Sequence, residues 1–417
     1  MQLSLSSAKG LLLAPVFFVL FTFFIPISPT IKSICFVCSL IAILIVPEYR
    51  NLIKEAFGTL WGRAAAILFV YIVIATLWSP APYLDQLGVV GKYCKLIYLP
   101  LLAVGFMSPK VRNWSINAYL AAIFLTCIIS MLKALNLIES QDPGMVFYNH
   151  IITGFMVALA AYLAGLQMFK NSGWLRSIYL FLLVFTSYQV LFINTGRTGY
   201  LVYIVLMVLL LVQTLSIKKA VLGLLVFTGT MSLVYQFSPV MQIRTFELLK
   251  DIQQLQHNNK NTSLGYRIQF HHYAKQLMMK NPWIGIGTGG FKYSFAKDDP
   301  VPSWGKELTD PHSQYWMILA EQGIIGLFLF IMFLASLFVT AFRVSESRPI
   351  LLGVLIAFCI GSISDTILCY STAGYLLIVL SALCFGELIA NKRTSEETKI
   401  QNANSTHLNH SGGEAAF

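Results

Sequence analysis

The sequence is poor in charged residues. Asp, Glu, Lys and Arg make up 11% of its 417 residues, whereas 57% are hydrophobic and the mean hydropathy is +0.70. A soluble domain carries about 25% charged residues, so this scarcity excludes an ordinary soluble protein. About 20 apolar residues cross a bilayer as a helix, and in an open chain only helices can cross, because lipid satisfies no backbone hydrogen bond. The expected fold is therefore an all-α polytopic membrane protein.

Cysteine is also scarce where it could do chemistry. All seven cysteines lie in or at the ends of apolar stretches, and none lies in the long polar segment 238–313, so no disulfide is expected there. Cys35 and Cys38 have redox or zinc spacing, but no second pair or histidine lies nearby. Small hydrophobic side chains are the better interpretation. Asp298 and Asp299 have no further ligand set around them, so no metal site is predicted.

The apolar residues form about twelve runs that are expected to span a membrane: 10–28, 31–47, 63–78, 92–107, 114–135, 150–169, 177–194, 199–216, 220–237, 314–342, 349–366 and 371–390. Lys and Arg collect in alternate connections, which indicates cytoplasmic segments. These are 48–62, 108–113, 170–176, 217–219, 343–348 and the tail. The connections 136–149 and 367–370 contain neither Lys nor Arg. Both termini are thus predicted to be cytoplasmic, and the net charge of +11 indicates topology rather than nucleic-acid binding.

This pattern divides the chain into four parts. Residues 1–237 carry nine predicted spans, and 314–390 carry three more. Between them, 238–313 forms one long outward-facing loop that is expected to contain amphipathic helices. The tail 391–417 is rich in Asn, Ser, Thr and Gly, a composition typical of disorder.

Arg197 lies in the phrase FINTGRTGY, between two apolar runs at the predicted outward face. A guanidinium is costly at that depth unless it has a partner or reaches the headgroups. One interpretation is a snorkelling arginine that anchors a helix. The other is an anion receptor, because the small neighbours Gly196 and Thr198 leave backbone amides and hydroxyls free to bind phosphate. The residues alone leave both open.

A second basic group lies in the phrase SLGYRIQFHHYAK. Four apolar residues recur there at helical spacing, which predicts an amphipathic helix lying on a membrane: Tyr266, Phe270, Tyr273 and Leu277. Three basic residues follow at four-residue steps on the neighbouring face: Arg267, His271 and Lys275. This face is either simply solvated or a row of cations for a lipid diphosphate.

The end of the polar segment holds a glycine run and a histidine. The run at 285–290 has the letters of a nucleotide-binding loop, but no strand–helix unit surrounds it, so a tight turn that brings backbone to the site is favoured. His312 precedes an apolar helix that should start near Gln314. Histidine can accept a proton near neutral pH, and a helix N-terminus disfavours its charged form; a polar helix-start residue is the alternative. Glu321, further along, needs a partner or a function.

Four phrases in this order resemble the O-antigen ligase and polymerase superfamily: TGRTGY (195–200), GYRIQF (265–270), NPWIGIGTGGF (281–291) and HSQYWMILAEQGIIGL (312–327). The chain's length and short tail are most similar to the ligase that joins O-antigen to lipid A–core. The resemblance implies a multi-pass glycosyltransferase of the bacterial inner membrane that serves lipopolysaccharide biosynthesis without metal or other cofactor. Its donor would be undecaprenyl diphosphate-linked O-antigen, and its acceptor a sugar hydroxyl of lipid A–core.

By the same resemblance, Arg197 and Arg267 hold the diphosphate, and His312 deprotonates the acceptor hydroxyl at the periplasmic face, with inversion at the anomeric carbon. Candidate supporting residues are Lys275, His271, Glu321 and Tyr266. One alternative is an O-antigen polymerase, which uses the same donor and a lipid-linked glycan as acceptor. Another is a transporter or flippase for lipid-linked glycans, which should place polar residues and broken helices near the bilayer midplane. The largely apolar runs favour the enzyme.

Overall fold

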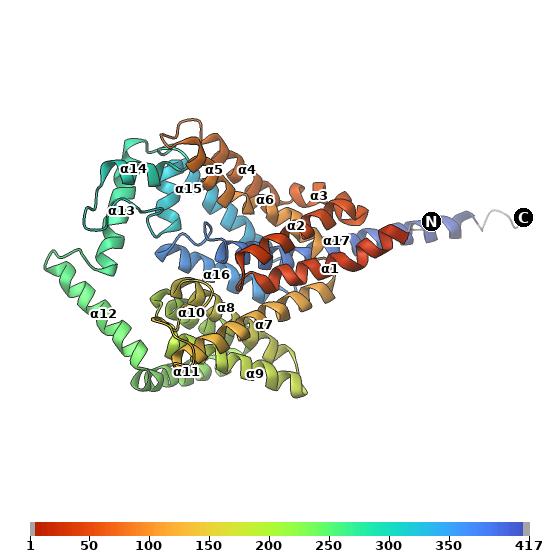
Figure 1. Ribbon diagram of the computed structural model, residues 1–417. Coiled ribbons are helices and arrows are strands. Elements are labelled where there is room, and N and C mark those ends of the chain that lie inside the picture. The colour runs from red at the N-terminus through yellow and green to blue at the C-terminus, as the bar shows by residue number, and fades with distance from the viewer. Residues whose placement is uncertain (1–4, 412–417) are drawn as a thin grey trace, which may run out of the picture.

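The computed structural model describes the backbone of residues 5–411, in which every regular element is a helix and no strand is present (Figure 1). The elements in chain order are α1 (Leu5–Phe24), α2 (Pro29–Ile45), α3 (Pro47–Gly58), α4 (Leu60–Ile74), α5 (Tyr83–Tyr93), α6 (Lys95–Gly105), α7 (Pro109–Ala134), α8 (His150–Lys170), α9 (Gly173–Tyr188), the π-helical turn η1 (Gln189–Ile193), α10 (Arg197–Thr214), α11 (Ile217–Phe237), α12 (Pro239–Gln256), α13 (Ser263–Lys280), α14 (Gly290–Asp298), α15 (Gln314–Ala341), α16 (Arg348–Ser364) and α17 (Ala373–Ser411). Every predicted apolar run coincides with one of these helices.

Eight helical stretches in the part of the chain that the structure describes are long and apolar enough to cross a membrane. The chain is therefore a multi-pass helical membrane protein. Three further apolar helices are shorter: 14–24, 60–74 and 348–364. The pair α2 and α3 is bent by 97°, because Val46 adopts the extended backbone that a following proline favours and Pro47 then opens a new helix. Twelve full spans stay a prediction.

The middle of the bundle contains α8 and the apolar part of α17, whose most apolar windows are 83% buried. Small residues let α8 and α10 approach closely, as in other membrane helix pairs. A methyl group on Gly199 would lie 3.0 Å from Gly154 Cα, and one on Gly165 would lie 2.4 Å from the side chain of Leu210. At the edge, α11 is only 6% buried. The rigid α8–α10 pair carries Arg197 at the first residue of α10.

The polar segment forms α12, α13 and α14 rather than an extended loop. The prediction that the second of these lies on a membrane was wrong. Its apolar residues Phe270, Tyr273 and Leu277 are buried in a second hydrophobic cluster with Phe291, Phe295 and Met317. Protein atoms of α14 and α15 cover that face, so α13 is a packed structural helix.

The connections gather at two ends of the bundle. At one end, Thr195 in the α9–α10 connection donates to Asp142 in 136–149 at 2.9 Å. At the other, residues of the predicted cytoplasmic segments line one pocket, among them Arg112, Lys170 and Ser347. This grouping agrees with the predicted sidedness, although which end is periplasmic stays a prediction.

The C-terminal tail differs from its prediction. The α17 backbone stays helical to Ser411, where the composition predicts disorder from residue 391. The first part of the tail, NKRTSEETKIQ, is rich in Lys, Glu and Gln, which have good helix propensity and can extend a helix already nucleated by the bundle. Residues 412–417 lie outside the described residues.

Candidate functional site

The glycine run packs against a break in α15. Gly323 has φ 66° and ψ −163° inside that helix, so the α15 hydrogen-bond ladder is interrupted there. The run supplies replacement partners: the amides of Ile286 and Gly287 donate to the carbonyls of Ala320 (3.0 Å) and Glu321 (2.8 Å). A methyl group on Gly285 would lie 2.6 Å from the Gly323 nitrogen. The expected tight turn is present, and the backbone it approaches is that of α15.

Glu321 belongs to this junction. Its side chain is fully buried, and its Oε1 accepts from the amide of Phe291 (3.2 Å), in the first turn of α14. The carboxylate therefore caps α14, where the helix dipole favours negative charge. The sequence predicted that Glu321 needs a partner or a function. The structure supplies a partner, the backbone of α14, and gives Glu321 a structural role.

His312 lies directly before α15, as the sequence predicts. Its backbone has φ 51°, an unusual value for a residue with a side chain, and its amide donates to Asp310 Oδ1 at 3.0 Å. The imidazole packs on Phe270, with 5.9 Å between ring centroids. This strained turn aims the ring at α16, because Nδ1 lies 3.5 Å from Asp365 Oδ1. His312 and Asp365 thus lie face to face beneath the turn.

Asp365 is the residue that sequence reasoning left outside the site. It is fully buried at the C-terminal end of α16. Its Oδ1 accepts from the amide of Thr366 (2.9 Å) and the hydroxyl of Tyr370 (3.0 Å). Its Oδ2 has no hydrogen-bond partner among the described residues, and the same is true of His312 Nδ1. A buried acid close to a span end was the available signal.

Two buried lysines hold the connection that follows Asp365. Lys95 Nζ donates to the carbonyl of Leu368 at 2.9 Å, and Lys32 Nζ donates to the carbonyl of Ser371 at 2.6 Å. Both ammonium groups also lie over the Tyr375 ring, 5.6 and 4.6 Å from its centroid. These contacts give the backbone around Asp365 a fixed position, and so they position the partner of His312.

The electrostatic setting of His312 differs from the prediction that a helix N-terminus keeps it neutral. Burial alone lowers the pKa of His312, but the Asp365 carboxylate, 3.5 Å away, and the charge of Asp310 outweigh it, so the pKa is raised above its ordinary value. The positive charge of Arg267 acts in the opposite direction. The imidazole is therefore a stronger base than a free histidine, and Asp365 rather than the helix dipole decides its strength.

The same three side chains form the one group of His, Cys, Asp and Glu residues, among those the structure describes, whose ligand atoms lie close enough to be considered for a metal. Atoms of Asp310, His312 and Asp365 lie within 4.8 Å of one another. Two observations favour a base with its partner acid over a cation site. One Asp365 oxygen already accepts two hydrogen bonds, and the charge of Arg267 reaches His312.

Arg267 lies on the side of α13 that faces this pair. Its pKa is lowered chiefly by burial, and the positive charge of Arg197 lowers it further, whereas the negative charge of Asp365 opposes the shift. These interactions place both arginines and the His312–Asp365 pair in one polar region. No carboxylate lies within ion-pair distance of Arg267 among the described residues. Its charge is thus available to an anionic ligand.

Arg197 follows the π-helical turn η1 and opens α10. Single π-turns are frequent at functional sites. Its Nη1 and Nη2 both donate to Asp251 Oδ2 of α12, each at 3.2 Å. The next residue of the motif, Thr198, shares a 2.9 Å hydrogen bond with Ser364, which directly precedes Asp365. The α9–α10 connection is thereby tied to the same end of α16.

The remaining predicted candidates divide by position. His271 stacks on Trp316, with 6.0 Å between centroids, and its buried Nε2 has no hydrogen-bond partner among the described residues. It lies beside the backbone of His312, and burial is the main cause of its lowered pKa. Lys275 is exposed. Tyr266 packs edge-on against Trp304, 5.0 Å between centroids, and so supports the chain between α14 and α15.

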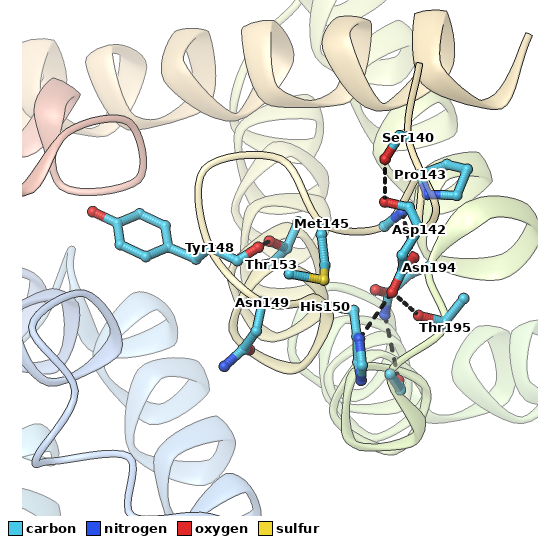
Figure 2. Close-up of polar contacts among 12 residues, drawn as sticks. Ser140, Asp142, Pro143, Met145, Tyr148, Asn149, His150, Thr153, Asn194 and Thr195 are labelled. Atoms are coloured by element: carbon cyan, nitrogen blue, oxygen red, sulfur yellow. Dashed lines mark hydrogen bonds and ion pairs between the residues drawn. The ribbon is translucent and has the colours of Figure 1, made fainter. Parts of the chain in front are cut away.

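A second polar cluster borders the α9–α10 connection (Figure 2). His150 Nδ1 and Thr195 Oγ1 both lie 2.9 Å from Asp142 Oδ2, and the amide of Gly144 donates to Asp142 Oδ1 at 2.9 Å. Figure 2 shows His150 and Thr195 converging on this carboxylate from α8 and from the motif. The cluster fixes the residue two places before Arg197. Sequence reasoning missed it, because its members are distant along the chain.

Residues 180–331 match the family model described as O-antigen ligase. The matched segment contains Arg197, Arg267 and His312, together with the glycine run that packs on α15. No curated protein matches the chain.

Proposed function

We propose that the chain is a member of the O-antigen ligase and polymerase superfamily, which the match over residues 180–331 supports, and that it is the O-antigen ligase. It would transfer polysaccharide from undecaprenyl diphosphate to a sugar hydroxyl of lipid A–core, at the periplasmic face of the bacterial inner membrane. The observation that carries the proposal is the convergence of two arginines and a histidine–aspartate pair at one end of the helical bundle. Both partners would be lipid-anchored, which suits a site at a membrane edge.

The two arginines suit the leaving group. A diphosphate leaves easily if its growing negative charge is neutralised, so fixed cations can take the place of a general acid. Arg197 and Arg267 come from different helices, which allows them to contact different phosphate oxygens. A guanidinium also offers paired N–H donors that match phosphate geometry.

The histidine suits the nucleophile. A sugar hydroxyl attacks poorly unless a base removes its proton, and such a base contributes roughly 10²–10⁴-fold in rate. In the proposed step, the acceptor oxygen bonds to the anomeric carbon from the face opposite the diphosphate. The bond from that carbon to the diphosphate oxygen breaks, and the acceptor proton moves to His312. Asp365 stabilises the resulting imidazolium, and the configuration at the anomeric carbon is inverted.

An O-antigen polymerase is the second candidate, because the same family match and the same donor chemistry fit it. The two enzymes differ in the acceptor. The arginines contact only the donor in this scheme, and His312 would take a proton from either acceptor's hydroxyl, so these residues do not distinguish the two enzymes. The flippase alternative is less well supported. The break inside α15 is repaired by the glycine run rather than left open for a substrate.

The test uses a strain lacking this gene, in which lipopolysaccharide and undecaprenyl-linked glycan are separated on gels. A ligase predicts rough lipopolysaccharide, with long O-antigen retained on its lipid carrier. Complementation with His312→Ala should fail at normal membrane levels of the protein. The control His272→Ala, an exposed histidine on α13, should restore most transfer. Core capped by a single repeat would instead identify a polymerase, and rescue by His312→Ala with failure of His272→Ala would overturn the assignment of the base.

A further inference from the structure

Arg197 already binds an anion that belongs to the protein. Its two terminal guanidinium nitrogens donate to one oxygen, Asp251 Oδ2, at 3.2 Å each. The backbone amide of Leu264, in the first turn of α13, donates to the same oxygen at 3.3 Å. Asp251 is largely buried, with 13% of its side chain exposed, so this contact is more than a surface ion pair. A single carboxylate oxygen thus collects three N–H donors.

That donor set is the one a phosphate oxygen would require. A guanidinium and the free amides at a helix N-terminus are the two groups that proteins most often direct at phosphate. The helix concerned is α13, and Arg267 lies one turn beyond Leu264 on it. Arg267 itself has no carboxylate partner within ion-pair distance among the described residues. The second arginine of the proposed site is therefore open, while the first is occupied.

The helix that delivers Asp251 is weakly held. Apart from the shielded side chain of Asp251, α12 makes little buried contact, and none of its residues is fully buried. Four of its apolar side chains are 41–68% exposed: Ile243, Phe246, Leu249 and Ile252. Figure 1 shows α12 running along the outside between α11 and α13. Its first turn is fastened by Ser238, whose hydroxyl donates to the Leu191 carbonyl at 2.6 Å. Elements with few buried contacts detach at low free-energy cost.

We propose that Asp251 occupies the phosphate position of the donor site in the ligand-free protein, and that the lipid-linked diphosphate displaces it and releases the end of α12. This inference rests on the proposed function of Arg197. A diphosphate carries more charge than one carboxylate and can contact both arginines, so it wins the exchange. After transfer, the return of Asp251 to Arg197 competes with the diphosphate product and speeds its release.

The experiment measures pyrophosphate binding to the purified full chain in detergent by titration calorimetry. Asp251→Asn keeps the shape of the side chain and removes the competing charge. It should bind pyrophosphate about tenfold more tightly than the wild type, the effect of removing one charge-assisted competitor worth about 1.4 kcal/mol. Glu247→Gln is the matched control. It makes the same charge change on α12, but its partner is Arg244, at 2.7 Å, so it should bind like the wild type.

Arg197→Gln separates the two proposals. If Arg197→Gln loses binding and Asp251→Asn binds no better than the wild type, the donor site stands and the displacement of Asp251 is refuted. If the wild type, Asp251→Asn and Arg197→Gln all fail to bind, the phosphate role of Arg197 fails, and the inference with it. A second measurement needs no variant, and so it tests the proposal even if a substitution prevents folding. In the wild type, pyrophosphate should raise amide hydrogen exchange in residues 239–256, and unchanged exchange there would contradict the displacement.

Discussion

At the scale of single residues, the proposed chemistry rests on pairs that are distant in sequence. His312 owes its raised pKa to Asp365, which directly follows α16 and faces His312 only in the tertiary structure. Arg197 is paired with Asp251, and Thr195 with Asp142. In each pair, the residue that lies within a motif could be identified from the sequence. Its aspartate partner, which lies outside the motifs, could not.

Replacing Asp365 with Asn gives a prediction about pH. Asp365 raises the pKa of His312, and only the neutral imidazole can accept the acceptor proton, so activity should rise as pH rises through that pKa. In Asp365→Asn, the acidic limb of the kcat/KM profile should move to lower pH. At the same time kcat should fall, by no more than the roughly 10²–10⁴-fold that a general base contributes.

The control for this prediction is Asp298→Asn. Asp298 belongs to the same polar segment but accepts from the Tyr273 hydroxyl at 2.8 Å instead of facing His312. Its acidic limb should stay where the wild-type limb lies. If the acidic limb of the kcat/KM profile does not move in Asp365→Asn either, a group other than His312 titrates there. His271 would be the first alternative, because it lies beside the His312 backbone.

At the scale of elements, the break in α15 is the feature on which the site is built. The part of α15 before Gly323 follows closely on His312. The glycine run connects this part to α14 and to the end of α4, because the Thr288 amide donates to the Ala75 carbonyl at 3.0 Å. A methyl group on Gly323 would lie 2.5 Å from both the Gly285 nitrogen and the Trp283 carbonyl oxygen. Only glycine fits this position, for reasons of φ and of space.

Gly323→Ala should therefore destabilise the protein by at least about 1–3 kcal/mol, the usual cost of a strained backbone position. The measurement is the thermal unfolding midpoint of the detergent-solubilised protein. Gly229→Ala on α11 is the control, because a methyl group there meets nothing within 4 Å; it should leave the midpoint unchanged or raise it slightly. Equal midpoints for Gly323→Ala and the wild type would mean that α15 does not need the break.

At the scale of the whole molecule, the helices gather the polar connections at two opposite ends. The end with Arg197, Arg267 and His312 also holds 136–149, which lacks Lys and Arg, and the other end holds the basic connections around Arg112 and Lys170. The positive-inside rule then predicts that the site faces away from the cytoplasm.

Labelling with a membrane-impermeant maleimide tests this orientation. Glu139→Cys and Ser172→Cys place thiols at exposed positions in the two kinds of connection. In intact spheroplasts Glu139→Cys should be modified and Ser172→Cys should not, while both should react after lysis. Peptide mapping separates the new thiols from the seven native cysteines. If only Ser172→Cys were labelled before lysis, the orientation in the membrane would be the reverse of the predicted one, which would contradict a periplasmic site.

The sequence by itself determined the class of the molecule, the location of each apolar helix and the motif phrases that contain Arg197, Arg267 and His312. These follow from local properties, since hydrophobic length, charge bias and motif order are read along the chain. Only the tertiary structure decided that α13 packs on protein instead of membrane, that Glu321 caps a helix, and that Asp365 and Asp251 face the motif residues. Those outcomes depend on which helices meet, and burial and pairing between distant segments have no local signature in the sequence.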